Sequence, residues 1–122
     1  MSTDERVAAA AEKAYSRGAY PHVVNSRPTI DKVSTLTAFA EALSFPDYFG
    51  HNLDALYDCL TDLSWLPRGE HVLIWPGSDV LRRADPKTYL AVRSVLSDAQ
   101  RALGPTGQSA GSWRLTVVLP DA

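Results

Sequence analysis

The stretch Phe45-Pro-Asp-Tyr-Phe-Gly-His-Asn-Leu-Asp-Ala-Leu-Tyr-Asp-Cys-Leu-Thr-Asp-Leu63 decides how the rest of the chain is interpreted. It predicts a tight loop followed by an amphipathic helix over residues 52–63, because leucines recur at the spacing of one helical face. These leucines are Leu53, Leu56, Leu60 and Leu63. Asp47-Tyr-Phe-Gly50 supplies the turn, in which Gly50 is free to take a positive φ. Asn52 is expected to cap the helix.

The other side of this helix is acidic. At about 100° per residue, Asp54, Asp58 and Asp62 lie opposite the leucines, with Asp58 near the centre of their face. Like charges four residues apart repel by roughly 0.2–0.5 kcal/mol per pair, and Asp62 also lies near the negative C-terminal end of the helix. No Lys or Arg on the helix compensates this repulsion. We interpret the row of aspartates as a surface for a positively charged partner.

Composition favours one domain in a reducing compartment. A chain of 122 residues with 45% hydrophobic content can bury a core. No apolar run approaches the roughly 20 residues that span a bilayer, and the N-terminus lacks the basic-then-apolar pattern of a secretion signal. The single cysteine, Cys59, excludes an intramolecular disulfide. We therefore expect a soluble cytoplasmic protein.

The net charge of −2 conceals an uneven distribution. Residues 33–67 hold five acids and no Lys or Arg, whereas the remaining nine acids and twelve bases give +3. Acidity is therefore concentrated in the central segment. This argues against direct binding of nucleic acid through that surface, because phosphates would be repelled. It suits a basic protein surface instead.

The rest of the chain predicts strands alternating with helices. The expected strands are residues 22–25, 71–75 and 113–119, and the expected helices are residues 3–17, 34–45, 78–84 and 85–103, besides 52–63. Strands separated by helices predict an α/β fold with a three-stranded parallel sheet. We expect an N-terminal helical extension over residues 1–18 and the main domain over 19–122.

Capping residues set the expected boundaries. Thr3, Ser34 and Asp85 are the expected N-caps. Gly18 ends the first helix and Gly104-Pro105 the last. Residues 104–112, rich in Gly, Ser and Pro, form the most flexible-looking segment. The apolar face of the first helix is thin, so that helix is expected outside the domain, or loosely docked.

Catalytic motifs are absent from the sequence. His22, His51 and His71 lack the spacing of a metal site, and no Gly-rich phosphate loop, GxSxG elbow or HExxH occurs. Cys59 flanks the leucine stripe, where a buried, inert thiol is the common outcome. A dyad of Cys59 with His51 would span about 12 Å along a helix. We therefore expect no catalytic residue and no cofactor.

The aspartates and aromatic residues permit several interpretations. Three aspartates spaced one turn apart, about 6 Å, cannot converge to the 2.0–2.6 Å that a hard cation requires, so no metal is expected. A plain solvated face is the simplest alternative for the row. Phe45 and Phe49 are expected in the core or as staple residues beside the helix, whereas Tyr48, Tyr57 and Trp65 suit either the edge of the core or a partner contact.

The segment Tyr48-Phe-Gly-His-Asn-Leu-Asp-Ala-Leu-Tyr-Asp-Cys-Leu-Thr61 closely resembles the signature of the barstar family. Members of this family are intracellular inhibitors of secreted bacterial ribonucleases of the barnase type. The resemblance is specific from Phe45 to Thr61 and weaker over about 90 residues. It implies a small three-stranded parallel sheet with helices, in agreement with the element order above. Residues 1–18 extend beyond the usual start of the family.

The resemblance implies that the acidic helix and the loop before it enter the nuclease active site. Asp58 would take the position of an RNA phosphate and meet catalytic His and Arg residues, and Asp54 would pair with neighbouring bases. Tyr48 would pack by the catalytic histidine, and Asp98 would make a peripheral contact. The implied partner-binding residues are Tyr48, Phe49, Gly50, Asn52, Leu53, Asp54, Tyr57, Asp58, Thr61, Asp62 and Asp98.

Three positions depart from the family pattern. The family often has Tyr at the position of Phe49 and Trp at that of Tyr57, which could retune the choice of partner. The family tryptophan just past the helix has no clear match, since Leu63, Ser64 and Trp65 all compete for that place.

Three hypotheses follow. The first is a monomeric, cytoplasmic inhibitor that binds a guanyl-specific ribonuclease one to one and performs no chemistry. The second is a barstar-like module repurposed for another basic partner or a toxin. The third is a metal-dependent hydrolase that uses the aspartates.

Overall fold

The computed structural model describes residues 1–103 and 112–121. These residues form α1 (Thr3–Ser16), β1 (Tyr20–Val23), α2 (Lys32–Leu43), α3 (Leu53–Asp62), β2 (Gly69–Ile74), α4 (Ser78–Ala84), α5 (Pro86–Leu103) and β3 (Trp113–Val118). The expected α/β class is confirmed. The expected break at Gly104-Pro105 and the segment 104–111 lie outside the described residues. In the described part of the chain, no helix has the length and apolarity needed to cross a membrane.

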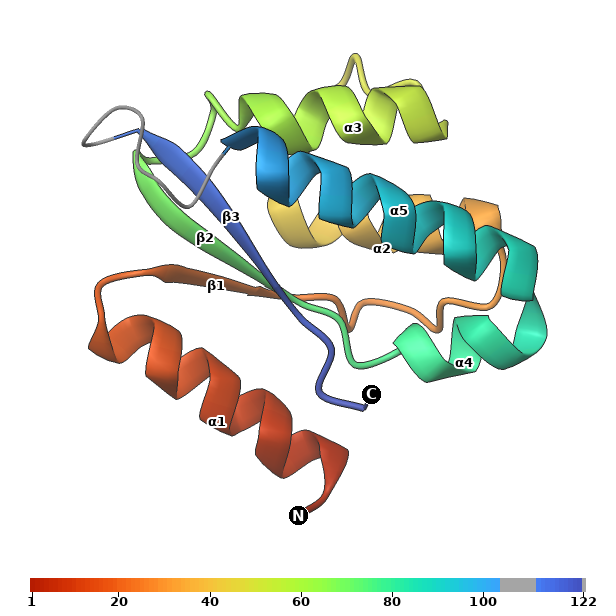
Figure 1. Ribbon diagram of the computed structural model, residues 1–122, viewed down its shortest axis with the longest axis horizontal. Coiled ribbons are helices and arrows are strands. Elements are labelled where there is room, and N and C mark those ends of the chain that lie inside the picture. Colours follow the sequence, from red (N-terminus) through yellow and green to blue (C-terminus); the bar gives the residue numbers. More distant parts are fainter. Residues whose placement is uncertain (104–111, 122) are drawn as a thin grey trace.

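The sheet has the order β1-β2-β3, and both pairs of strands are parallel. β2 is therefore central, and its side chains from His71 to Ile74 are buried. Helices α2, α3 and α5 cover one face of the sheet, and α1 covers the other (Figure 1). A parallel sheet buried on both faces is the arrangement that the continuous apolar run of β2 predicts.

The larger core lies between the sheet and the three helices. Leu73 of β2 and Trp75, just after its end, project into a cluster with Phe39 of α2, Leu56 of α3 and Leu96 of α5. The rings of Phe39 and Trp75 meet edge to face, with centroids 5.1 Å apart. This core fixes α3, because the leucine face of that helix is part of it.

The smaller core lies under α1. Ala10 and Ala14 of α1 pack towards Val72 and Ile74 of β2, and Ala14 is completely buried. Small side chains let the helix approach the sheet closely. The thin apolar face that predicted an external position is therefore a docking face, and Gly18, with φ of 77°, turns the chain into β1 as expected.

Two predicted caps were wrong. Ser2, not Thr3, caps α1 and forms a capping box with Glu5. Asp31, not Ser34, caps α2 and accepts the Ser34 N–H, while the Ser34 hydroxyl accepts the Asp31 N–H. In each case the earlier residue is selected by the reciprocal hydrogen bonds of a capping box, which Ser2 forms with Glu5 and Asp31 forms with Ser34. The predicted cap of α5 is confirmed, since Asp85 accepts hydrogen bonds from Thr88.

The first strand begins two residues before its expected start. β1 spans Tyr20–Val23 and therefore includes Pro21, which precedes the expected strand 22–25. A proline is compatible with β1 because this strand is at the edge of the sheet, where some N–H groups have no ladder partner.

A buried carboxylate ties α1 to the sheet. Arg17 donates two hydrogen bonds of 2.9 Å to the Glu70 carboxylate of β2, and the Thr116 hydroxyl of β3 donates a third of 2.6 Å. The Glu70 side chain is 16% exposed. Its hydrogen bond with Arg17 is the main cause that lowers the pKa of Glu70 to about 2.

We expect Glu70→Gln to lower the free energy of unfolding by about 1–2 kcal/mol at pH 7, because it removes a partly buried, charge-assisted pair. A carboxylate with a lowered folded pKa stabilises the fold above its unfolded pKa near 4.5, and this contribution is lost as the pH falls towards 2. Urea denaturation at several pH values measures both effects.

The control is Glu12→Gln, which neutralises an exposed acid of α1 without touching this network. Equal stability of the two variants across this pH range would contradict the role assigned to Glu70.

Candidate partner-binding surface

The loop before α3 runs back along that helix. It leaves α2 at Ser44, whose φ is 54°, and turns where the Phe49 N–H donates to the Pro46 carbonyl at 3.0 Å. Gly50 does not use its freedom to take a positive φ, and it is His51 that has a φ of 51°. The Nδ1–H of His51 donates to the Phe49 carbonyl at 3.2 Å, and this contact supports the strained backbone.

Aromatic packing fixes the loop. The ring of Phe45 lies 4.9 Å from that of Phe49 and 5.9 Å from that of Trp65. The Trp65 indole also donates to the Leu43 carbonyl at 2.9 Å. Phe49 is only 6% exposed. It therefore supports the loop from inside rather than offering a free ring at the surface.

α3 is capped and anchored as the sequence predicted. The Asn52 side chain accepts the Ala55 N–H at 2.7 Å. Leu56, Leu60 and Leu63 are completely buried, and Leu53 is half-buried. Leu63 ends the helix in the left-handed region. Of the three residues that competed to extend the surface, Leu63 is thus enclosed in the core, and Ser64 and Trp65 are the ones with exposed area.

The acidic side of α3 faces solvent. Asp54, Asp58 and Asp62 are exposed, and within the described part of the chain none of them forms an ion pair. Asp62 accepts a hydrogen bond from the Ser64 hydroxyl at 3.1 Å. Carboxylates held on a rigid helix without a cationic neighbour can accept hydrogen bonds from a basic partner at little conformational cost.

Tyr48 lies beside this row. Its side chain is 73% exposed. Desolvation, followed by the negative charge of Asp62, raises the pKa of the Tyr48 hydroxyl, which places the ring near the C-terminal half of α3. The surface therefore combines a row of carboxylates with an exposed aromatic ring, a residue type that is enriched at protein interfaces.

The structure adds a cation that the sequence did not assign to this surface. Lys32, the first residue of α2, borders a shallow depression of about 430 Å³ together with Asn52, Leu53, Asp54, Ala55 and Asp58. Lys32 lies one residue before the acidic segment 33–67 and 22 positions before Asp54, so no local pattern could have linked them. Its ammonium group moderates the potential at one end of the row.

The remaining predicted residues occupy less exposed or paired positions. Tyr57 is half-buried and packs against the larger core. The Thr61 hydroxyl donates to the Tyr57 carbonyl at 2.8 Å, within the helix. Gly50 is exposed in the loop. Asp98 is exposed on α5, but it is ion-paired with Arg101 and is therefore less available than the aspartates of α3.

Cys59 is 3% exposed, as its position beside the leucines predicted. Burial raises the pKa of its thiol, and Asp58 and Asp62 raise it further, so the thiolate is disfavoured. Across residues 1–103 and 112–121, no group of three or more His, Cys, Asp or Glu side chains is arranged to hold a metal ion.

The fold brings together two histidines that are 49 residues apart. His71 must donate from Nε2 to the Pro67 carbonyl, at 2.7 Å, because a carbonyl only accepts. Its Nδ1 then accepts the Nε2–H of His22, at 2.9 Å, when both rings are neutral. The Tyr20 ring stacks on His71, with centroids 5.0 Å apart. Burial, and next the charge of His71, lower the pKa of His22 to about 4, and burial lowers that of His71.

We expect this pair to make stability fall as the pH drops from about 6.5 to about 4. Over that range the imidazoles bind protons in the unfolded chain but stay neutral in the folded protein. The free energy of unfolding therefore decreases, by roughly 1–3 kcal/mol. His22→Gln, which can still donate to His71, should flatten the curve. Urea denaturation at pH 4.5 to 7.5 measures the slope.

His51→Gln is the matched control, because His51 is exposed in the loop and lies outside the pair. In this variant, the free energy of unfolding should vary with pH as it does in the wild-type protein. The Glu70 effect lies at lower pH and does not obscure this range. An unchanged slope in His22→Gln would refute the assignment.

Comparison with known proteins identifies relatives of this chain. A sequence model described as "Barstar (barnase inhibitor)" matches residues 20–113. The Bacillus subtilis (strain 168) protein "Putative ribonuclease inhibitor YrdF" is 63% identical over 27 residues, which are 22% of this chain and 30% of that protein. The chain thus aligns with less than a third of the length of this relative. The family match includes α2, α3 and the central strand.

Proposed function

The chain belongs to the Barstar (barnase inhibitor) family, and we propose that it inhibits a secreted, guanyl-specific bacterial ribonuclease by covering the active site with α3 and the loop before it. Family membership points to ribonuclease inhibition in general, and to an inhibitor rather than an enzyme. The similar Bacillus subtilis protein carries the name of a ribonuclease inhibitor. The complex would contain one copy of each protein, and the free inhibitor would be a cytoplasmic monomer.

One observation carries this proposal. Asp54 and Asp58 are exposed, one turn apart, on a helix whose other face is locked in the core. Active sites that cleave RNA bind phosphates with cationic side chains, so a fixed carboxylate can accept the same hydrogen bonds. Asp58 would occupy the central position, with Asp54 beside it and Tyr48 covering the edge.

The supporting residues have a separate role in the proposal. Phe49 and Asn52 would hold the loop and the start of α3 in shape, so that little entropy is lost on binding. Leu53, Tyr57 and Thr61 would border the contact, with Gly50 offering its backbone. Asp98, already paired with Arg101, would contribute at the periphery.

The position of Lys32 favours one alternative. A cation beside Asp54 and Asp58 weakens the attraction for a uniformly basic site. The surface could then belong to a barstar-like module for another basic partner, one that places a neutral or acidic group near Lys32. A nuclease panel distinguishes the two, since the alternative predicts no inhibition of any guanyl-specific enzyme.

We expect Asp58→Ala to weaken nuclease binding by about 3–5 kcal/mol, because the cationic groups of the partner lose their acceptor. The fold should be unchanged or slightly more stable, by about 0.2–0.5 kcal/mol for each repulsive pair relieved. Titration calorimetry against a secreted microbial guanyl-specific ribonuclease, with RNA cleavage followed in parallel, measures the loss. Association should also slow with added salt.

Glu12→Ala is the control, since it removes the same charge from α1, on the other face of the sheet. Retained inhibition by Asp58→Ala, together with lost stability, would refute the role given to this residue. Failure of the wild-type protein to bind several such enzymes would reject the nuclease target and favour the alternative module.

A further inference from the structure

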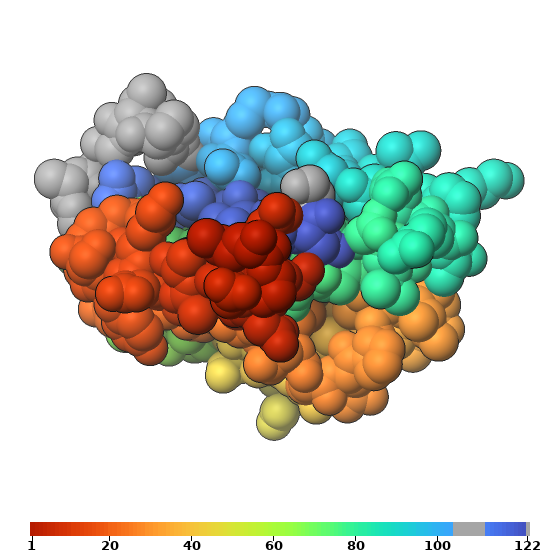
Figure 2. Space-filling model, turned by 90° about the horizontal axis from the view of Figure 1, so that it is seen from below, coloured from red at the N-terminus to blue at the C-terminus, as the bar shows by residue number. Residues whose placement is uncertain are grey.

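α1 leaves part of its sheet face open. It packs mainly on β1 and β2, and a groove of about 380 Å³ lies between it, the outer strand β3 and the C-terminal turn. Figure 2 shows β3 as a blue strip that α1, in red and orange, does not cover. A helix is about 10 Å wide with its side chains, and strands lie about 4.8 Å apart, so one helix covers about two strands.

The floor of the groove is apolar and its border is basic. Small or apolar residues form the floor: Ala9, Ala10, Val72, Val118 and Pro120. The border consists of Arg6, Lys13 and Arg17. At 100° per residue, these three positions span an arc of roughly 40° around the axis of α1, so they lie along one edge of it. The acids of α1, Asp4, Glu5 and Glu12, lie at least about 100° away from Arg6 by the same geometry.

Two of the three cations keep an uncompensated charge. Arg17 is neutralised by Glu70. Arg6 donates to the Pro120 carbonyl at 3.2 Å, a contact with a neutral group. Among the described residues, no carboxylate lies within ion-pair distance of Arg6 or Lys13. These two side chains are seven residues apart, about 10 Å along the helix axis.

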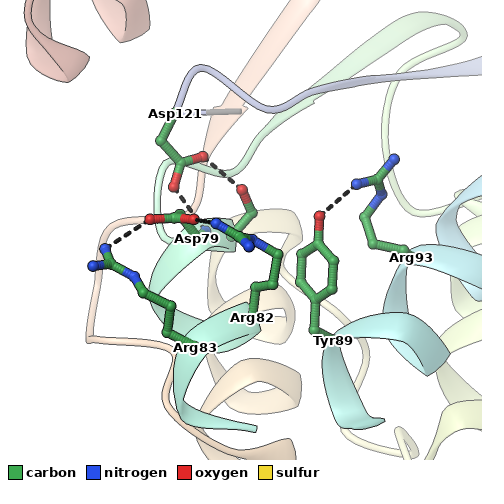
Figure 3. Close-up of polar contacts among 7 residues, drawn as sticks. Asp79, Arg82, Arg83, Tyr89, Arg93 and Asp121 are labelled. Carbon is green, nitrogen blue, oxygen red and sulfur yellow. Dashed lines mark hydrogen bonds and ion pairs between the residues drawn. The ribbon is translucent and has the colours of Figure 1, made fainter. Parts of the chain in front are cut away.

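The end of the groove is fixed in place. Asp121, next to Pro120, accepts the Ser78 hydroxyl at 2.5 Å and the Asp79 N–H at 2.8 Å (Figure 3). The tail therefore caps α4, which has no side-chain cap of its own. Two arginines of α4, Arg82 and Arg83, lie near this tail. They do not form a second basic site, because both are paired with Asp79.

We propose that this groove docks an acidic, amphipathic helix of a partner protein. Such a helix would place apolar side chains on Ala9 and Val118, which are partly exposed, and two carboxylates, seven residues apart, against Arg6 and Lys13. It would lie beside α1 and cover β3. Apart from Val72, every residue that lines the groove lies outside residues 20–113, the part matched to the inhibitor family. The docking site is therefore separate from α3 and does not depend on the nuclease proposal.

The probe is a capped amphipathic peptide of about 16 residues, long enough for marginal helicity, with a leucine stripe bordered by glutamates seven residues apart. A second peptide has glutamine in place of each glutamate. Binding to the full chain is followed by calorimetry and by amide shifts in ¹⁵N-labelled protein. We expect saturable one-to-one binding of the acidic peptide, with shifts confined to α1 and β3.

Charge reversal tests the basic border. Lys13→Glu should weaken binding about tenfold, the effect of losing one ion pair and gaining a repulsion. Lys87→Glu makes the same change on the first turn of α5 and should have no effect. Asp58→Ala should also bind the peptide normally, which separates this site from the nuclease surface. Arg6→Glu with Lys13→Glu should abolish the shifts, while circular dichroism verifies the fold.

Several results would overturn the proposal. These are equal binding of the glutamine peptide, unaltered affinity in Lys13→Glu, or absence of shifts in α1 and β3 at millimolar peptide. Binding to vesicles of anionic phospholipid in place of the peptide would also overturn it, because the groove would then be a lipid contact.

Discussion

The burial of β2 on both faces is the constraint from which the remaining structure follows. Its residues from His71 to Ile74 are closed to solvent, so each face of the sheet needs its own covering layer. α2, α3 and α5 supply one layer and α1 supplies the other (Figure 1). Without α1, Val72 and Ile74 would be exposed. Glu70 would also lose Arg17, its main hydrogen-bond partner.

The same constraint explains how an unfavourable row of charges persists on α3. Repulsion among Asp54, Asp58 and Asp62 amounts to a few tenths of a kcal/mol per pair. Burial of Leu56, Leu60 and Leu63 contributes about 1.5–3 kcal/mol each. The leucine face therefore outweighs the acidic face, and the helix forms without neutralising cations. The residues that stabilise the helix and those proposed to meet a partner lie on opposite sides of one element.

The sequence predicted the buried and the exposed side of α3 because this pattern lies within one short segment. Spacing of three and four residues reports which side of a helix is buried, and it correctly gave the leucine face and the buried Cys59. Capping chemistry gave the Asn52 cap, and the alternation of strands and helices gave the parallel sheet. Choices between near-equivalent local options were less secure, as Ser2 over Thr3 and His51 over Gly50 show. In the first case the reciprocal hydrogen bonds between Ser2 and Glu5 fix the cap, and in the second the hydrogen bond from His51 to the Phe49 carbonyl supports the left-handed backbone.

Contacts between distant segments had no signal in a single sequence. His22 and His71 meet only because β1 and β2 pair in one register. Lys32 reaches the depression beside Asp54 because the start of α2 lies there, although 22 positions separate the two residues. This second contact matters for function. A row of aspartates read alone is uniformly acidic, whereas the assembled surface has a cation at one end. Any partner must therefore match a potential that Lys32 moderates around the depression it shares with Asp54 and Asp58, and not around Asp62. A basic site of uniform charge would gain less from this surface than one that keeps its cations away from Lys32.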